Sequence, residues 1–137
     1  MLQLKHRGDS ALGVRFMATI CLYQDSRHEK PLSWIRTRLG CGYVSRRNDG
    51  MTELRINGFS QVRESLETLL PYLRFKHQQA RMLIKTCKKL EQKTIRSMSK
   101  RELRTIVTLL LQIQNENYAS KRRRASEDLH KILGLTP

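Results

Sequence analysis

The sequence predicts an α+β fold: a four-stranded antiparallel sheet with helices packed on one face, in the order ββαββα plus C-terminal helices. Two observations support this prediction. Two pairs of short segments alternate apolar with polar residues, and turn-forming residues separate the members of each pair. Segments with helical spacing of apolar residues follow each pair. A third observation is that no Gly- or Ser-rich linker divides the 137 residues, so one core is expected.

The first hairpin is predicted over residues 2–23. Residues 2–6 alternate, and turn formers fill residues 7–10. Residues 13–23 put apolar side chains at even positions from Val14 to Leu22, and place Arg15, Met17, Thr19, Cys21 and Tyr23 at odd positions. This period of two predicts a strand with one buried face.

A helix of about nine residues is predicted next, because the apolar period changes. Pro31 suits its first turn, Leu32 and Leu39 share a face, and Gly40 is suited to the left-handed stop position. A second hairpin follows, with strands at about 42–47 and 51–57. Asn48-Asp49-Gly50 forms its turn, since these residue types tolerate positive φ.

The rest of the chain is predicted to be helical. Ser60 is expected to cap a helix that Pro71 ends, and residues 76–91 repeat apolar residues at helical spacing. Ser99 begins a capping box for a helix over 100–114, and a last helix is expected over 122–133. We therefore expect a ββαββα domain over residues 1–95 and a basic helical extension over 96–137 packed on it.

The charge of the chain indicates a polyanionic partner. The formal net charge is +15, and residues 72–137 hold 16 Lys or Arg against 5 Asp or Glu. Such a charge on a chain that is not of low complexity favours nucleic acid, RNA or double-stranded DNA, over acidic membrane. No apolar run approaches the roughly 18 residues of a membrane span, and no leader pattern is present, so an intracellular protein without membrane contact is expected.

The titratable residues argue against a metal or hydrolytic site. Cys21, Cys41 and Cys87 are odd in number and lack a C-x-x-C spacing, which disfavours disulfides and zinc. The four histidines are scattered, and no nucleophile motif is present. Reduced thiols and no metal ligands are the expectation.

The outward face of the predicted sheet is the candidate binding surface. Strands in a major groove can reach base edges, where Arg pairs with guanine, Gln with adenine and Glu with cytosine. A solvated sheet face, with no partner, is the alternative that periodicity leaves open. The candidate residues on this face are Gln3, Lys5, Arg7, Arg15, Thr19, Tyr43, Ser45, Arg47, Glu53 and Arg55.

Three segments carry a resemblance to a known family: "LGCGYVSRRNDGMTELRI", "LLPYLRFKHQQARMLI" and "QNENYASKRRRASEDLHKIL". Together they resemble the single-motif LAGLIDADG homing endonucleases known from algal organelle introns, over residues 1 to about 133. The resemblance implies a saddle of strands that sits in the DNA major groove with helices behind it. It also implies that the protein acts in an organelle, a mitochondrion or a chloroplast.

The resemblance assigns site residues by matching positions. Gln24 corresponds to a polar residue that positions water, Lys76 to a basic residue near the scissile phosphate, and Arg74 to a neighbouring basic position. Gln78 stands where a lysine can be found. The family's name-giving helix, which carries the metal-binding acid, should precede the first strand, and Met1 already falls at that strand. We therefore expect no cofactor in this chain alone, no cleavage by it alone, and a protein or RNA partner over the surface that the helix would cover.

Two functions follow from these observations. The first is a nucleic-acid-binding protein derived from a homing endonuclease, acting on RNA or in a ribonucleoprotein such as an organellar ribosome. Basic clusters away from the sheet favour it, among them Lys121, Arg122, Arg123 and Arg124. The second is a subunit of a split DNA endonuclease, in which another chain supplies the helix and its acid and Gln24 and Lys76 work with Mg²⁺.

Overall fold

Four antiparallel strands form a single sheet in the computed structural model, which describes residues 1–8, 13–116 and 126–135. The strands are β1 (Leu2–His6), β2 (Val14–Asp25), β3 (Tyr43–Arg46) and β4 (Met51–Asn57), in the spatial order β1-β2-β4-β3. Both predicted hairpins are present, as β1–β2 and β3–β4. The predicted α+β class with a four-stranded antiparallel sheet is confirmed.

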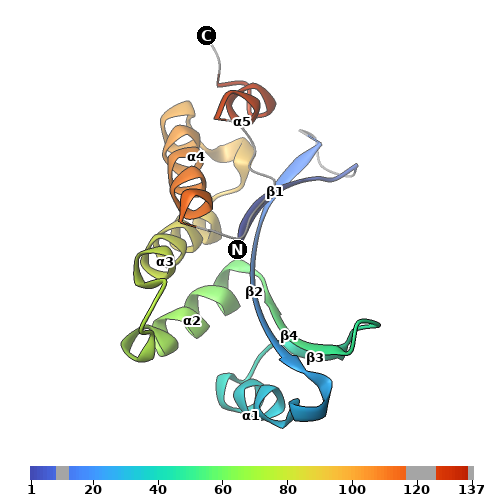
Figure 1. Ribbon diagram of the computed structural model, residues 1–137. Helices are drawn as coiled ribbons and strands as arrows, with labels where there is room; N and C mark the ends of the chain where they lie inside the picture. Colours follow the sequence, from blue (N-terminus) through green and yellow to red (C-terminus); the bar gives the residue numbers. More distant parts are fainter. Residues whose placement is uncertain (9–12, 117–125, 136–137) are drawn as a thin grey trace.

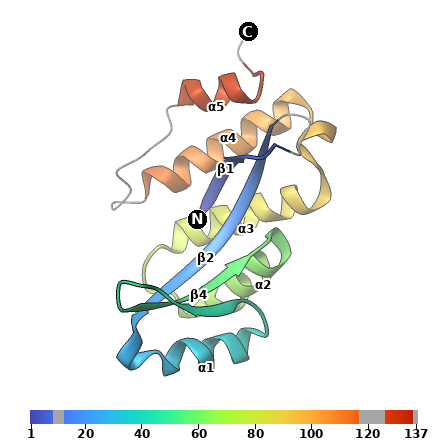
Figure 2. The same ribbon diagram turned by 90° about the vertical axis from the view of Figure 1, so that its right-hand side faces the viewer.

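The helices lie along one side of this sheet. They are α1 (Lys30–Leu39), α2 (Phe59–Leu69), α3 (His77–Gln92), α4 (Lys100–Asn115) and α5 (Ser126–Ile132). Short 3₁₀ turns occur at η1 (Ser26–His28), η2 (Leu70–Tyr72) and η3 (Ile95–Ser97). Figure 1 shows α2, α3 and α4 on one side of β2 and no helix on the other. Figure 2 looks onto that open side, with the sheet in front of the helices.

The long strand β2 joins the two hairpins into one sheet. Its first part, Val14 to Ala18, pairs with β1, and its second part, Thr19 to Asp25, pairs with β4. The strand bends along its length, and its concave side faces away from α2, α3 and α4 (Figure 1). The open face is therefore a curved surface, and the two ends of β2 carry different neighbouring strands.

The core lies between the sheet and the helices. Period-two burial puts Leu4, Phe16 and Ile56 on the helix side, each no more than 5% exposed. Ile106 and Leu129, from α4 and α5, belong to the same cluster of buried residues. The apolar stripes of the C-terminal helices thus bury the N-terminal strands, and each such side chain contributes about 1.5–3 kcal/mol of hydrophobic stabilisation.

The predicted helix ends are partly right. Gly40 ends α1 in the left-handed conformation at φ 69°, and the capping box at Ser99 is complete. The predicted cap at Ser60 is wrong, because α2 begins at Phe59 with Gly58 in the capping position and no side-chain cap. Gly58 takes φ 97°, which lets the helix begin directly after β4, so the serine falls inside the first turn.

The second hairpin turns through one positive φ angle, at Gly50 (φ 77°). Asn48 and Asp49 keep negative φ, and the Asp49 carboxylate accepts a hydrogen bond from the Met51 amide instead. This is a three-residue loop with glycine in the left-handed position. The last predicted helix, 122–133, begins outside the described residues, where positions 122–125 fall, and α5 accounts for 126–132.

Candidate nucleic-acid interface

The open face of the sheet brings together residues from all four strands. Strand register sets Tyr43, Arg55 and Cys21 side by side in one row, and Ser45, Glu53 and Tyr23 in the next. Lys5 lies opposite Arg15 near the other end, and Gln3 lies opposite Met17. Side chains alternate between faces along each strand, so all of these residues lie on the side without helices.

The two loops next to this face hold the remaining predicted arginines. Arg7 follows β1, where its amide donates to the Gly13 carbonyl, and it is exposed. Arg47 follows β3, pairs with Asp49 at 3.0 Å, and lies with its guanidinium 5.5 Å from the Tyr23 ring centre. Both arginines are therefore at the rim of the open face.

Two predicted contact residues are less accessible than expected. Thr19 is 5% exposed and donates a hydrogen bond of 2.9 Å to Asn57 across the strand pair. Glu53 is 7% exposed, because neighbouring side chains on the face cover it. Both lie on the open face by register, but little of either side chain reaches solvent.

Arg55 and Glu53 form an ion pair in the middle of the face. Arg55 Nη2 lies 3.1 Å from Glu53 Oε1 and donates a hydrogen bond of 3.3 Å to Oε2. The Arg55 side chain remains 35% exposed and that of Glu53 only 9%. The electrostatic influence of nearby Cys21, and then of Glu53, raises the pKa of Arg55, whose guanidinium is charged at neutral pH.

Two polar residues of this face, Tyr23 and Asn57, were not among the predicted contacts. Tyr23 is 46% exposed, and a hydrogen bond with Cys21 followed by burial raises the pKa of its hydroxyl. The phenol therefore stays a neutral hydrogen-bond donor at physiological pH. Asn57 is exposed and partners Thr19. Both fall within the predicted strands, at positions that the period of two already assigns to this face.

The two residues expected near a cleavage site come from different elements. Gln24 lies opposite Thr52 on the helix side of the sheet, near the end of β2. Lys76 precedes α3 in the left-handed conformation (φ 59°), and the nearby exposed Arg74 lies in the same connection. Figure 1 shows the end of β2 beside α1 and the start of α3 away from it.

The described residues do not form a magnesium site. No group of three or more His, Cys, Asp or Glu side chains within the described ranges is placed to hold a metal ion. Gln24 offers one amide oxygen and Lys76 offers none, whereas Mg²⁺ binds several oxygen ligands. Separately, none of the helices in the described part of the chain has the length and apolar character that a bilayer crossing requires.

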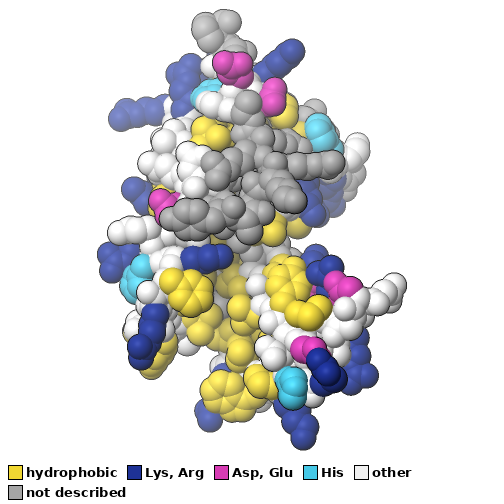
Figure 3. All heavy atoms as spheres, viewed as in Figure 1, with side chains coloured by type: hydrophobic (Ala, Val, Ile, Leu, Met, Phe, Trp, Pro, Cys, Tyr) yellow, Lys and Arg dark blue, Asp and Glu magenta, His cyan; other side chains and the backbone are white. Residues whose placement is uncertain are grey.

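The helix side of the sheet carries an exposed apolar surface. Figure 3 shows hydrophobic side chains gathered in the hollow between α2 and α1. Large aromatic side chains with high exposure belong to the elements around it: Trp34 of α1 at 62%, Tyr72 of η2 at 80% and Phe75 before α3 at 75%. An exposed apolar surface of this kind is typical of a contact with another polypeptide.

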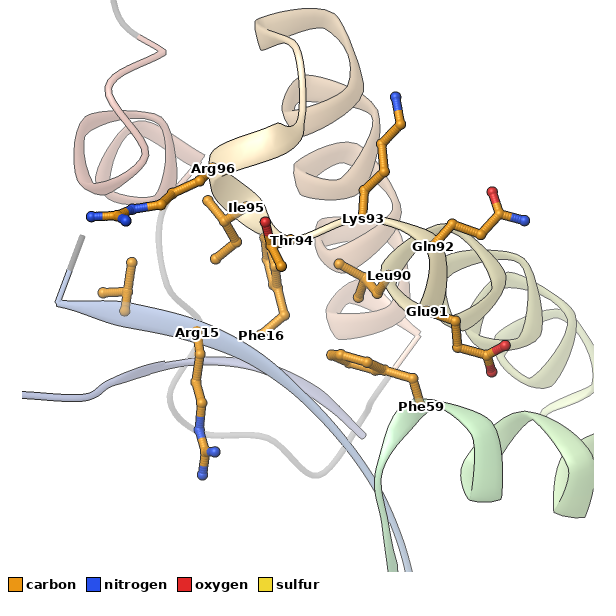
Figure 4. Close-up of a pocket in the computed structure, with 11 residues that line it drawn as sticks. Arg15, Phe16, Phe59, Leu90, Glu91, Gln92, Lys93, Thr94, Ile95 and Arg96 are labelled. Carbon is orange, nitrogen blue, oxygen red and sulfur yellow. The ribbon is translucent and has the colours of Figure 1, made fainter. Parts of the chain in front are cut away.

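A cavity of about 460 Å³ lies between the start of β2, the first residue of α2 and the end of α3. Its walls include Phe16, Phe59, Leu90 and Ile95, as Figure 4 shows. Arg15 points away from it toward the open face of the sheet (Figure 4). The polar side chains at its rim do not converge on its interior, so the cavity adds nothing to the candidate interface.

A basic surface lies on the outer side of the helical layer. We call Arg81, Lys85, Lys100 and Arg101 the α3–α4 basic surface. All four are exposed, and none forms an ion pair with another described residue. Figure 3 shows Lys and Arg side chains along this edge of the molecule. The predicted contacts Lys121, Arg122, Arg123 and Arg124 lie outside the described residues.

Comparisons with known proteins agree with the predicted family. No protein-family model matches the chain. The DNA endonuclease I-CvuI of Chlorella vulgaris is 36% identical over 88 residues, which are 64% of this chain and 55% of that protein. The match thus spans little more than half the length of this curated relative.

Solved structures match over nearly the whole chain. The homing endonuclease I-CvuI in complex with the I-CreI target superposes with a TM-score of 0.79 and 27% identity, covering 97% of this chain and 82% of that one. The archaeal intron-encoded homing endonuclease I-Vdi141I, complexed with DNA, gives 0.80 at 18% identity over 97% and 84%, a likeness of fold. The sequence match and the shared fold both agree with the family that the sequence resembles, the LAGLIDADG homing endonucleases.

Proposed function

We propose that the chain binds double-stranded DNA through the open face of its sheet. The observation that carries this proposal is the face itself: a concave surface without helices, on which Lys5 and Arg15 lie in one row and Arg55 in another. A curved antiparallel ribbon fits a major groove, where cations contact phosphates and polar side chains contact base edges. I-CvuI and I-Vdi141I, whose folds match, are themselves seen in complex with DNA.

The test is selection from a random duplex pool with the purified chain, followed by measurement of affinity for the selected duplex. Wild-type protein is expected to enrich a sequence. The Lys5→Ala/Arg15→Ala protein should bind that duplex more weakly, with the slope of log affinity against log salt reduced by about 1.8, since each lost phosphate contact accounts for about 0.9.

The matched control is Lys100→Ala/Arg101→Ala, which removes the same charge from the helical side. It should leave duplex affinity unchanged. Absence of any enriched duplex, or an equal loss in the control, would contradict the proposal.

A second candidate function is RNA binding, as in the ribonucleoprotein role expected from the sequence. The α3–α4 basic surface favours it, because these cations lie off the sheet and are not neutralised by described acidic residues. Exposed Lys and Arg of this kind contact phosphates without sequence preference. An organellar location, in a mitochondrion or chloroplast, remains a prediction from the resemblance.

Cleavage belongs to the alternative of a composite endonuclease. Gln24 and Lys76 would act there with Mg²⁺ only together with carboxylates from another segment or chain, because the described residues lack the oxygen ligands. The exposed apolar surface between α1 and α2 supports such a covering polypeptide. This alternative requires that cleavage occur only when the second polypeptide is present.

A further inference from the structure

The Glu53–Arg55 pair is the most constrained charged group on the open face. Both residues belong to β4 and are two positions apart, so their side chains project from the same face. They are flanked on both sides, since Arg55 lies between Cys21 and Tyr43 and Glu53 between Tyr23 and Ser45. A long side chain in this central position has fewer conformations available than one at an edge.

The two partners are buried to different extents, which separates their roles. With a side-chain exposure of 9%, the Glu53 carboxylate has little surface left for a base. Arg55, at 35%, keeps part of its guanidinium accessible. Its Nε is buried and has no hydrogen-bond partner within the described chain, and both contacts to Glu53 come from Nη2. The terminal Nη atoms of Arg55 are therefore the part of the guanidinium that is accessible to a ligand.

From this geometry, and on the basis of the proposed DNA binding, we infer that Arg55 reads a guanine in the major groove and that Glu53 is the positioning residue for this contact. Guanine presents two acceptors, N7 and O6, which match two parallel N–H donors of a guanidinium. Adenine replaces O6 with the N6 amino donor, which opposes a second arginine donor. The Glu53 contact lowers the number of conformations that Arg55 loses on binding.

The alternative is an ion pair that only stabilises the sheet. Under that alternative, substitutions of Glu53 or Arg55 change the free energy of unfolding but leave base preference untouched. A lysine at position 55 keeps the charge and loses the paired donors, so it separates the two roles. Glu53→Gln keeps the size of the side chain and removes the charge that holds Arg55.

The experiment uses the duplex selected by wild-type protein and compares variants at each position of that duplex. Arg55→Lys is expected to lower the preference for guanine at one position by about 5- to 150-fold. Glu53→Gln should reduce the same preference at the same position, and the double variant should lose no more than Arg55→Lys alone, because the two residues act as a unit. Arg101→Lys, the same change on the helical side of the molecule, is the matched control and should leave that position unchanged.

A probe on the DNA side can be applied to the wild-type chain. Replacing the guanine with 7-deazaguanine removes the N7 acceptor and should weaken wild-type binding, while Arg55→Ala protein, which has no donor at this position, should bind both duplexes alike. If the selected duplex contains no guanine whose preference depends on Arg55, the inference is wrong, whereas the proposed DNA binding still stands. Failure of the wild-type chain to select any duplex would instead refute the proposed function, and the inference with it.

Discussion

At the residue scale, Glu29 connects three elements behind the open face. It precedes α1 and accepts hydrogen bonds from Arg46 of β3, at 2.9 Å, and from the Thr52 hydroxyl of β4, at 2.7 Å. Ser26 shares a further hydrogen bond with Thr52. One carboxylate thus ties the start of α1 to the hairpin that carries Arg55 and Glu53.

This carboxylate makes the stability of the fold depend on acid pH. The hydrogen bonds from Arg46, and then from Thr52, lower the pKa of Glu29 from 4.5 to about 2. A lowered folded-state pKa contributes stability that is present above about 4.5 and lost as the pH falls through about 2. Glu29→Gln should therefore lower the urea midpoint of unfolding at pH 6, and the two proteins should converge near pH 2.

Glu127→Gln, on the exposed part of α5, is the control for this comparison. It makes the same chemical change away from the hairpin and should not alter the pH dependence. A constant difference between wild type and Glu29→Gln from pH 6 to pH 2 would show that the Glu29 interactions do not depend on its charge.

The alternation of side chains explains which site residues could be predicted. A period of two is a local pattern, so it assigns the odd positions of β2 and the matching positions of β1, β3 and β4 to one face from the sequence alone. The low exposure of Thr19 and Glu53 could not be predicted, because it depends on the neighbours that strand pairing brings to them. The position of Lys76 relative to Gln24 depends on how α3 packs against the sheet, and no local pattern encodes that placement.

At the element scale, the entry into β3 depends on a glycine that the sequence pattern did not single out. Gly42 takes φ 88°, and a Cβ built there would lie 2.8 Å from the Arg55 carbonyl oxygen and 2.9 Å from Ile56 Cγ1. The chain therefore passes against the backbone of β4 where no side chain fits. Gly40, two residues earlier, also has positive φ but has open space around its Cβ position.

These two glycines give a matched pair for measuring the close approach. Gly40→Ala should cost about 1–2 kcal/mol, from backbone strain alone. Gly42→Ala should cost about 3 kcal/mol or more, because overpacking against β4 adds to the strain. Urea unfolding of the two variants measures both costs, and equal losses would mean that β3 shifts easily away from β4.

The elements themselves were predictable because their signals are local and strong. Gly40 and the capping box at Ser99 are signals of this kind, and both helix ends agree with the structure. The predicted cap at Ser60 was wrong because Gly58 allows α2 to begin earlier, at Phe59. The serine then lies in the first turn of the helix, where it does not cap. The bend of β2 needs both hairpins in place, so it follows from the assembled sheet and not from any segment.

At the scale of the whole molecule, charge is placed on two surfaces that face different ways. Lys5, Arg15 and Arg55 lie on the open face, whereas the α3–α4 basic surface lies on the outer side of the helical layer. Between Lys100 and Arg104 the cations fall in the first turns of α4, where the positive end of the helix dipole disfavours them. Phosphates bound on this side would offset that repulsion. Because the two surfaces face different ways, we expect them to bind nucleic acid independently.

Independent surfaces predict that a short RNA hairpin binds without competing with DNA. Fluorescence anisotropy of a labelled hairpin should not fall when the selected DNA duplex is added to saturation, because the helical layer separates the two surfaces. Lys85→Ala/Lys100→Ala/Arg101→Ala should weaken RNA binding and its salt dependence and leave DNA affinity as in wild type. Lys5→Ala/Arg15→Ala, the control for the other face, should weaken DNA binding and leave RNA affinity as in wild type. Displacement of the hairpin by equimolar DNA would show that both ligands use the open face, and the helical cations would then serve solubility alone.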